Sequence, residues 1–178
     1  GRAIYGIGEF LRAMAVHINL QKEMRMMSNP PIRRLTLDAA GGSVEALCAE
    51  PATPRAVVIA LHGGSHDAQY WHHPAAPKAS LLLLGSRLGF EVIALDRPGH
   101  GGSLKSFPNG ATLEEQVSII LDIARAVRAG RGLPVFLIGH SLGSVLALMA
   151  AASGRGTLID GIDVAGAPVR FTDEQDSS

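Results

Sequence analysis

The sequence has a single cysteine among its 178 residues, no excess charge of either sign and no long apolar run. Because Cys48 has no partner, no disulfide can form within the chain, and a reducing, cytoplasmic location is the simplest expectation. Lysine plus arginine number 16, as do aspartate plus glutamate, so no net charge favours nucleic acid or an anionic membrane as a partner. No apolar stretch reaches the roughly 18 residues of a membrane span.

The glycines of the sequence do not form a nucleotide-binding pattern. No Gly-x-x-x-x-Gly-Lys-Ser/Thr segment occurs, and the glycines that follow the most apolar strand are not spaced as Gly-x-Gly-x-x-Gly. A strand that turns into a helix at a phosphate site is therefore disfavoured. We expect neither a nucleotide cofactor nor any other cofactor.

What is present centres on an apolar strand that runs into Gly139-His140-Ser141-Leu142-Gly143. The Gly-x-Ser-x-Gly pattern predicts a strand-to-helix turn so sharp that the residues on either side of the serine crowd one another, and glycine removes the clash. Such a turn places the serine hydroxyl at a helix N-terminus, where free N–H groups stabilise negative charge. Ser141 is therefore the predicted nucleophile.

Two further segments agree with this turn. Residues 57–64 form an apolar strand that ends in His-Gly-Gly, and residues 90–103 form another that ends in Asp-x-x-Gly-x-Gly-x-Ser. Together, the three motifs resemble those of the α/β-hydrolase superfamily, over about residues 33–170. The resemblance implies hydrolysis of a small-molecule ester, thioester or related acyl substrate through an acyl-enzyme on Ser141. It also implies an oxyanion hole made by the backbone N–H groups of Leu142 and Gly64.

Strands and helices alternate through the rest of the chain, which predicts an α/β fold with a doubly wound, mostly parallel sheet, incomplete at the C-terminus. Residues 1–31 are predicted to form an N-terminal amphipathic helix or extension, and residues 32–178 the N-terminal portion of an α/β-hydrolase domain. The expected strands are 32–38, 43–49, 55–61, 90–95, 134–138 and 158–165. The expected helices are 78–88, 112–130 and 142–153, the second opening with a capping box at Thr112-Leu113-Glu114-Glu115.

The base that a serine nucleophile needs is not apparent. In similar proteins an acid and then a histidine follow the serine, but all seven histidines precede Ser141. Asp173 is a weak candidate for the acid, and a solvated polar tail is the alternative. We therefore interpret the chain as a fragment that is inactive or weakly active by itself and can self-associate through an unpaired sheet edge. A non-catalytic binding or interaction module of the same fold is the alternative hypothesis.

The loop after the His-Gly-Gly motif carries the remaining candidates. His66, His72 and His73 with Asp67 could gather around a metal ion, but their spacing matches no standard zinc pattern, and no metal is predicted. Tyr70 and Trp71 could line an acyl pocket beside Ser141, or be buried against the neighbouring helix. Cys48 is expected to be an inert core residue on one strand face with Val44 and Ala46.

Overall fold

Six strands form one sheet in this computed structural model, which describes residues 29–153 and 158–167. The strand order is β1-β2-β4-β3-β5-β6. The strands are β1 (Arg33–Ala39), β2 (Gly42–Ala49), β3 (Ala56–Leu61), β4 (Phe90–Leu95), β5 (Val135–His140) and β6 (Gly161–Ala165). Residues 1–28 of the extension predicted over residues 1–31, and the candidate acid Asp173, lie outside the described residues.

The sheet is mixed and mostly parallel, as predicted. β1 and β2 form an antiparallel hairpin, and β2 also pairs with β4 in the antiparallel direction. β4, β3, β5 and β6 are parallel to one another. Glycine makes the hairpin turn possible, because Gly41 adopts a φ of 83°. Parallel strands bring their carboxyl ends to one edge of the sheet, so the residues after β3, β4 and β5 meet there.

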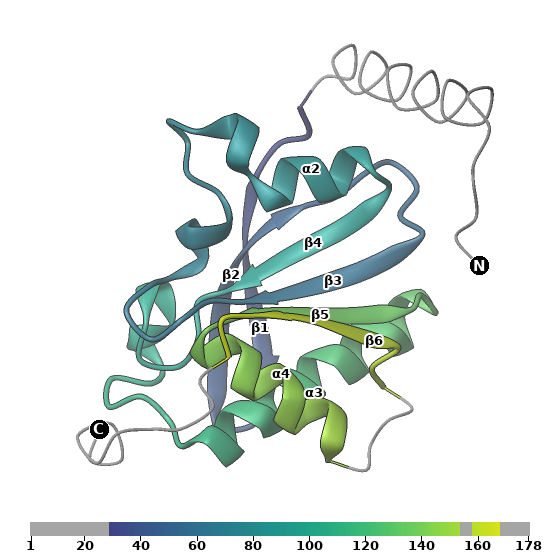
Figure 1. The fold of residues 1–178 in the computed structure, drawn as a ribbon. Helices are drawn as coiled ribbons and strands as arrows, with labels where there is room; N and C mark the ends of the chain where they lie inside the picture. Colours follow the sequence, from purple (N-terminus) through teal and green to yellow (C-terminus); the bar gives the residue numbers. More distant parts are fainter. Residues whose placement is uncertain (1–28, 154–157, 168–178) are drawn as a thin grey trace, which may run out of the picture.

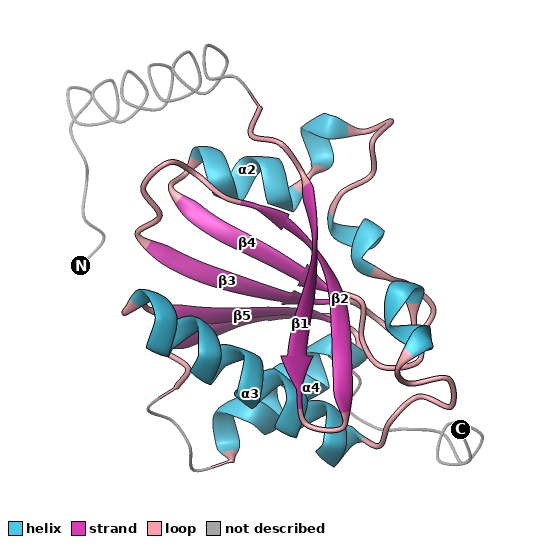
Figure 2. Ribbon diagram, turned by 180° about the vertical axis from the view of Figure 1, so that it is seen from behind, coloured by secondary structure: helices cyan, strands magenta, loops and turns pink. Residues whose placement is uncertain are grey.

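Helices cover both faces of the sheet (Figures 1 and 2). α2 (Leu81–Arg87) packs on one face, and α3 (Leu113–Arg131) and α4 (Leu142–Ala152) pack on the other. Val44, Ala46 and Cys48 are fully buried in the larger core on the α3 and α4 face, as expected from their alternation. No helix within residues 29–153 and 158–167 is long and apolar enough to cross a membrane.

Element ends differ from the sequence prediction at several places. The helix expected from Lys78 is split, because the Ser80 hydroxyl accepts a hydrogen bond from the Leu83 N–H and caps a new helix. A separate 3-10 turn, Pro77–Ala79, precedes it. α3 begins with the predicted capping box but runs past Gly130, because Gly132, with a φ of 64°, ends it. β5 extends two residues further than predicted, and β6 begins only at Gly161.

Candidate active site

The chain reverses direction at Ser141, between β5 and α4. Ser141 has φ 53° and ψ −118°, and it is the only non-glycine residue with a positive φ among those described. A Cβ on Gly139 would lie 2.4 Å from the Gly143 oxygen, and a Cβ on Gly143 would lie 2.1 Å from the Leu61 oxygen. The sharp turn predicted from the glycine spacing is therefore present, and only glycine fits on either side of it.

The turn leaves polar groups of Ser141 and Leu142 without local partners. Leu142 is the first residue of α4, so its N–H has no acceptor within the helix. The Ser141 side chain makes no capping hydrogen bond to the helix, while its backbone N–H donates to Ala165 in β6 over 2.9 Å. A hydroxyl and an N–H therefore share the positive end of a helix dipole.

The His-Gly-Gly segment after β3 lies directly against this turn. A Cβ on Gly63 would lie 3.3 Å from the Ser141 Cβ, so the two backbones are in close contact. Gly63 is buried, whereas Gly64 is exposed and has open space around its Cα. The fold thus brings Ser141, Leu142 and the segment that contains Gly64 to one edge of the sheet.

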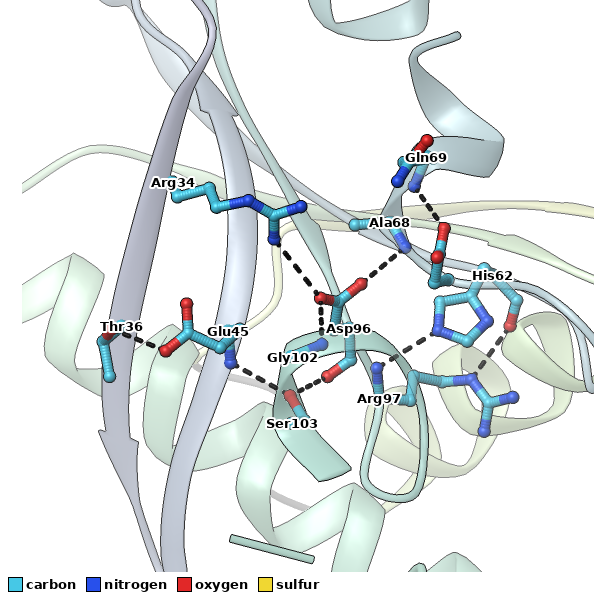
Figure 3. A network of polar contacts seen from close by, with 11 residues as sticks. Arg34, Thr36, Glu45, His62, Ala68, Gln69, Asp96, Arg97, Gly102 and Ser103 are labelled. Atoms are coloured by element: carbon cyan, nitrogen blue, oxygen red, sulfur yellow. Dashed lines mark hydrogen bonds and ion pairs between the residues drawn. The ribbon is translucent and has the colours of Figure 1, made fainter. Parts of the chain in front are cut away.

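His62, the first residue of that segment, is fully buried, and both of its ring nitrogens form hydrogen bonds. Figure 3 shows the one with Arg97. The backbone N–H of Arg97 donates to Nε2 over 3.1 Å, which leaves Nδ1 to donate to the Gly63 oxygen at 2.7 Å. Burial first, and then the charge of Arg97, lowers the pKa of His62 to about 3. The ring is therefore neutral, and it is a structural support of the loop.

The turn after β4 is held by Asp96. One carboxylate oxygen accepts the Ala68 N–H at 2.7 Å, and the other accepts the Gly102 N–H at 2.9 Å. Ser103 completes the motif, because its hydroxyl donates to the backbone carbonyl oxygen of Asp96 and accepts the Glu45 N–H (Figure 3). The Asp-x-x-Gly-x-Gly-x-Ser motif therefore links the loops after β3 and β4 to the hairpin.

The neutral His62 ring predicts a loss of stability in acid. Its pKa is about 3 in the folded protein against 6.5 for an ordinary histidine, so between these values the unfolded chain binds the extra proton. The free energy of unfolding should therefore fall as the pH drops below 6.5, with a His62 contribution approaching about 1.4 kcal/mol per pH unit. Urea unfolding at several pH values measures this slope. His62→Gln should reduce it by up to about 1.4 kcal/mol per pH unit, which corresponds to the uptake of one proton. His66→Gln, in the exposed part of the same loop, is the control, and an unchanged slope in His62→Gln would contradict the assignment.

The described histidine rings form their hydrogen bonds away from the Ser141 hydroxyl. His72 bonds to the Ser80 hydroxyl at 2.8 Å, and His73 accepts a local backbone N–H. His140 stacks on Tyr70 with ring centroids 4.8 Å apart, and its buried Nδ1 has no hydrogen-bond partner among the described residues. A base for Ser141 is therefore not found among them.

The loop candidates separate in the structure. Trp71 packs against the smaller core beside α2, whereas Tyr70 is exposed and stacks on His140. Within the described parts of the chain, no group of three metal-ligating side chains gathers, so His66, His72, His73 and Asp67 do not form a cluster. A shallow hollow of about 490 Å³ lies beside this loop, and Ser65, Tyr70, His100 and Leu104 are among the residues that line it.

Three buried polar residues of the site were not predicted from the sequence. Ser144 bonds through its hydroxyl to the backbone of Gly139 and Ala165, and thereby joins α4 to β5 and β6. Arg97 and Gln116 bond to each other at 2.7 Å under the His-Gly-Gly segment. The available signal was an arginine two residues after a continuous apolar strand, where a buried charge requires hydrogen-bond partners.

Comparisons with known proteins agree on one family. The family model described as "Alpha/beta hydrolase family" matches residues 58–176. Human protein phosphatase methylesterase 1 is 31% identical over 97 residues, which cover 54% of this chain and 24% of that protein. Human monoglyceride lipase is 31% identical over 109 residues, which cover 58% of this chain and 32% of that protein. The chain thus spans about a quarter to a third of the length of these curated relatives.

A solved structure extends the agreement to the fold. A highly thermostable carboxyl esterase from Bacillus coagulans superposes with a TM-score of 0.65 at 27% sequence identity. The match covers 82% of this chain and 47% of the esterase. The six-stranded arrangement described above therefore corresponds to about half of that enzyme.

Proposed function

Because this chain belongs to the alpha/beta hydrolase family, we propose that it carries the nucleophile and the oxyanion hole of a serine hydrolase. The substrate is an ester, thioester or related acyl compound, and Ser141 forms the acyl-enzyme. The relatives are named as a methylesterase and a lipase, so oxygen esters are the first class to test. The observation that carries the proposal is the strained turn, which sets the Ser141 hydroxyl beside N–H groups that no secondary structure uses.

In the proposed reaction, the Ser141 oxygen attacks the acyl carbon, and the carbonyl electron pair moves onto the oxygen. The backbone N–H groups of Leu142 and Gly64 donate hydrogen bonds to that oxyanion, and the dipole of α4 adds to its stabilisation. Collapse expels the alcohol or thiol with a proton, and water then cleaves the acyl-enzyme to regenerate the serine. A general base must accept the proton of Ser141, and this sequence has no histidine after Ser141 that could act as that base.

Part of the substrate is proposed to bind in the hollow beside Tyr70 and Leu104. These side chains are 40% and 47% exposed, so apolar surface is available there for an acyl or alcohol group. Ser65, the residue after Gly64, is among the residues that line the hollow. A substrate carbonyl at Ser141 can therefore have its apolar substituent against this wall.

Fluorophosphonate labelling of the complete gene product tests the proposal. The probe forms a Ser141 Oγ–phosphorus bond and releases fluoride, so a labelled peptide containing Ser141 is expected by mass spectrometry. Ser141→Ala should abolish the label. Ser144→Ala is the matched control, since this serine lies three residues away but its hydroxyl is buried and bonded to backbone. A folded protein with no label at Ser141 would refute the assignment.

A further inference from the structure

Arg97 is a buried cation beside the site. It lies in the turn after β4, next to Asp96, is 2% exposed and is among the largest fully buried side chains. Among the described residues it forms no ion pair with a carboxylate. Burial lowers its pKa to about 10, so the guanidinium is still charged at neutral pH. A buried charge without a carboxylate partner costs free energy unless its donors are satisfied.

The guanidinium donors converge on the His-Gly-Gly segment. Nε donates to the His62 oxygen at 3.0 Å, and one terminal nitrogen donates to the Gly63 oxygen at 2.9 Å. The other terminal nitrogen donates to the Gln116 side chain, which is itself fixed by a bond to Ala111. Figure 3 shows Arg97 in the turn after β4, with its Nε donating to the His62 oxygen. One planar fork therefore binds two consecutive carbonyl groups, a geometry that lysine cannot provide.

These bonds determine which way the next peptide points. The Gly63 oxygen accepts from both Arg97 and His62, so it is held toward the protein interior. In a trans peptide the C=O and the following N–H point in opposite directions, and no described peptide is cis. The Gly64 N–H must therefore point away from Arg97, toward the exposed side of the segment. Glycines on both sides of this peptide would otherwise let it rotate easily.

We propose that Arg97 is a positioning residue that preorganises the oxyanion hole, by fixing the Gly63–Gly64 peptide with its N–H on the outer side, next to Ser141. This inference rests on the proposed acyl-transfer function. A preorganised donor stabilises the oxyanion more effectively, because it does not have to reorient during the reaction. Arg97 does not touch the substrate, so its effect passes through the backbone of Gly63 and Gly64.

The test replaces Arg97 with methionine in the complete gene product. Methionine fills similar space but has no donors, so the Gly64 N–H should lose its fixed orientation. Removing one oxyanion donor costs about 10²- to 10³-fold in kcat, and we expect a loss of about 10²-fold for an oxygen ester. KM should change by less than about threefold, since the interaction is made in the transition state. Arg97→Lys should recover only part of the loss.

A thionoester of the same substrate separates positioning from general damage. Sulfur accepts hydrogen bonds weakly, so the ratio of ester to thionoester rates reports the oxyanion hole. This ratio should fall about as much as kcat in Arg97→Met. Arg131→Met is the matched control: Arg131 lies on α3, outside the site, where it pairs with Glu50 and, at 3.0 Å, with the buried Glu91 carboxylate. It should leave both kcat and the ratio unchanged.

The outcomes distinguish this inference from the function on which it rests. If the parent protein is labelled at Ser141 but Arg97→Met keeps the ester to thionoester ratio, Arg97 is only a core residue and the inference fails. If the parent protein is not labelled, the proposed function fails first. If Arg97→Met does not fold, Gln116→Met serves in its place, because it removes one anchor of the guanidinium and should lower the same ratio to a smaller extent.

Discussion

Gly143→Ala is expected to destabilise the protein by more than about 4 kcal/mol, a range reached only by severe core defects. The added Cβ would lie 2.1 Å from the Leu61 oxygen and 2.6 Å from the Leu61 carbonyl carbon. Both atoms belong to the backbone of β3, the strand between β4 and β5, so no side-chain rotation can relieve the overlap. Since whole domains are stable by only about 5–15 kcal/mol, this methyl group should remove most of the folded population.

A second glycine, Gly130, tests whether the loss of stability in Gly143→Ala comes from the steric overlap or from replacing a helical glycine as such. Gly130→Ala lies within α3, where a Cβ would meet nothing within 4 Å, and alanine favours a helix interior by about 0.5–1 kcal/mol. It should therefore be neutral or stabilising. Urea unfolding followed by circular dichroism measures both variants. A Gly143→Ala protein as stable as the parent would mean that α4 can move off β3 at little cost.

The architecture could be predicted from the sequence because its signals are local. Continuous apolar strands, the Ala40-Gly41-Gly42 turn and the capping box at Thr112 each specify their own element. The order of strands and helices then allows few topologies other than the observed mixed sheet. Element ends were less accurate, since Ser80 and Gly130 each permit two local structures and tertiary packing selects one. The predicted end of α3 at Gly130 was wrong because glycine is tolerated within a packed helix.

The site could be predicted only as far as its motifs reach. Glycine spacing located the turn at Ser141, because the steric requirement is encoded in neighbouring residues. The partners of Arg97 lie 34 and 35 residues before it and 19 after it. No local pattern encodes such contacts, and the bonds become visible only once β3, β4 and α3 are assembled. Ser144 was missed for the same reason, since its acceptor Ala165 is 21 residues away in β6.

Residues 1–178 expressed by themselves are expected to hydrolyse p-nitrophenyl acetate far more slowly than a complete serine triad does. The reason is the base: no histidine follows Ser141, and the rings of His62, His72 and His73 bond to Gly63, Ser80 and local backbone. Losing triad members commonly lowers kcat by about 10⁴- to 10⁶-fold. An intact oxyanion hole and binding can still give about 10³- to 10⁴-fold catalysis over water.

Residual catalysis of this kind has a distinctive signature. Without a base, Ser141→Ala should change the slow rate little, because the remaining stabilisation is proposed to come from the N–H groups of Leu142 and Gly64. Arg97→Met should lower it more, since that change acts on the orientation of the Gly64 N–H itself. Initial rates of the three proteins, each corrected for spontaneous hydrolysis, decide the matter. A fast rate that Ser141→Ala abolishes would mean that a preceding histidine acts as the base, and His140→Gln and His100→Gln would then identify it. Such a result would overturn the inference drawn from the order of serine and histidine along the chain.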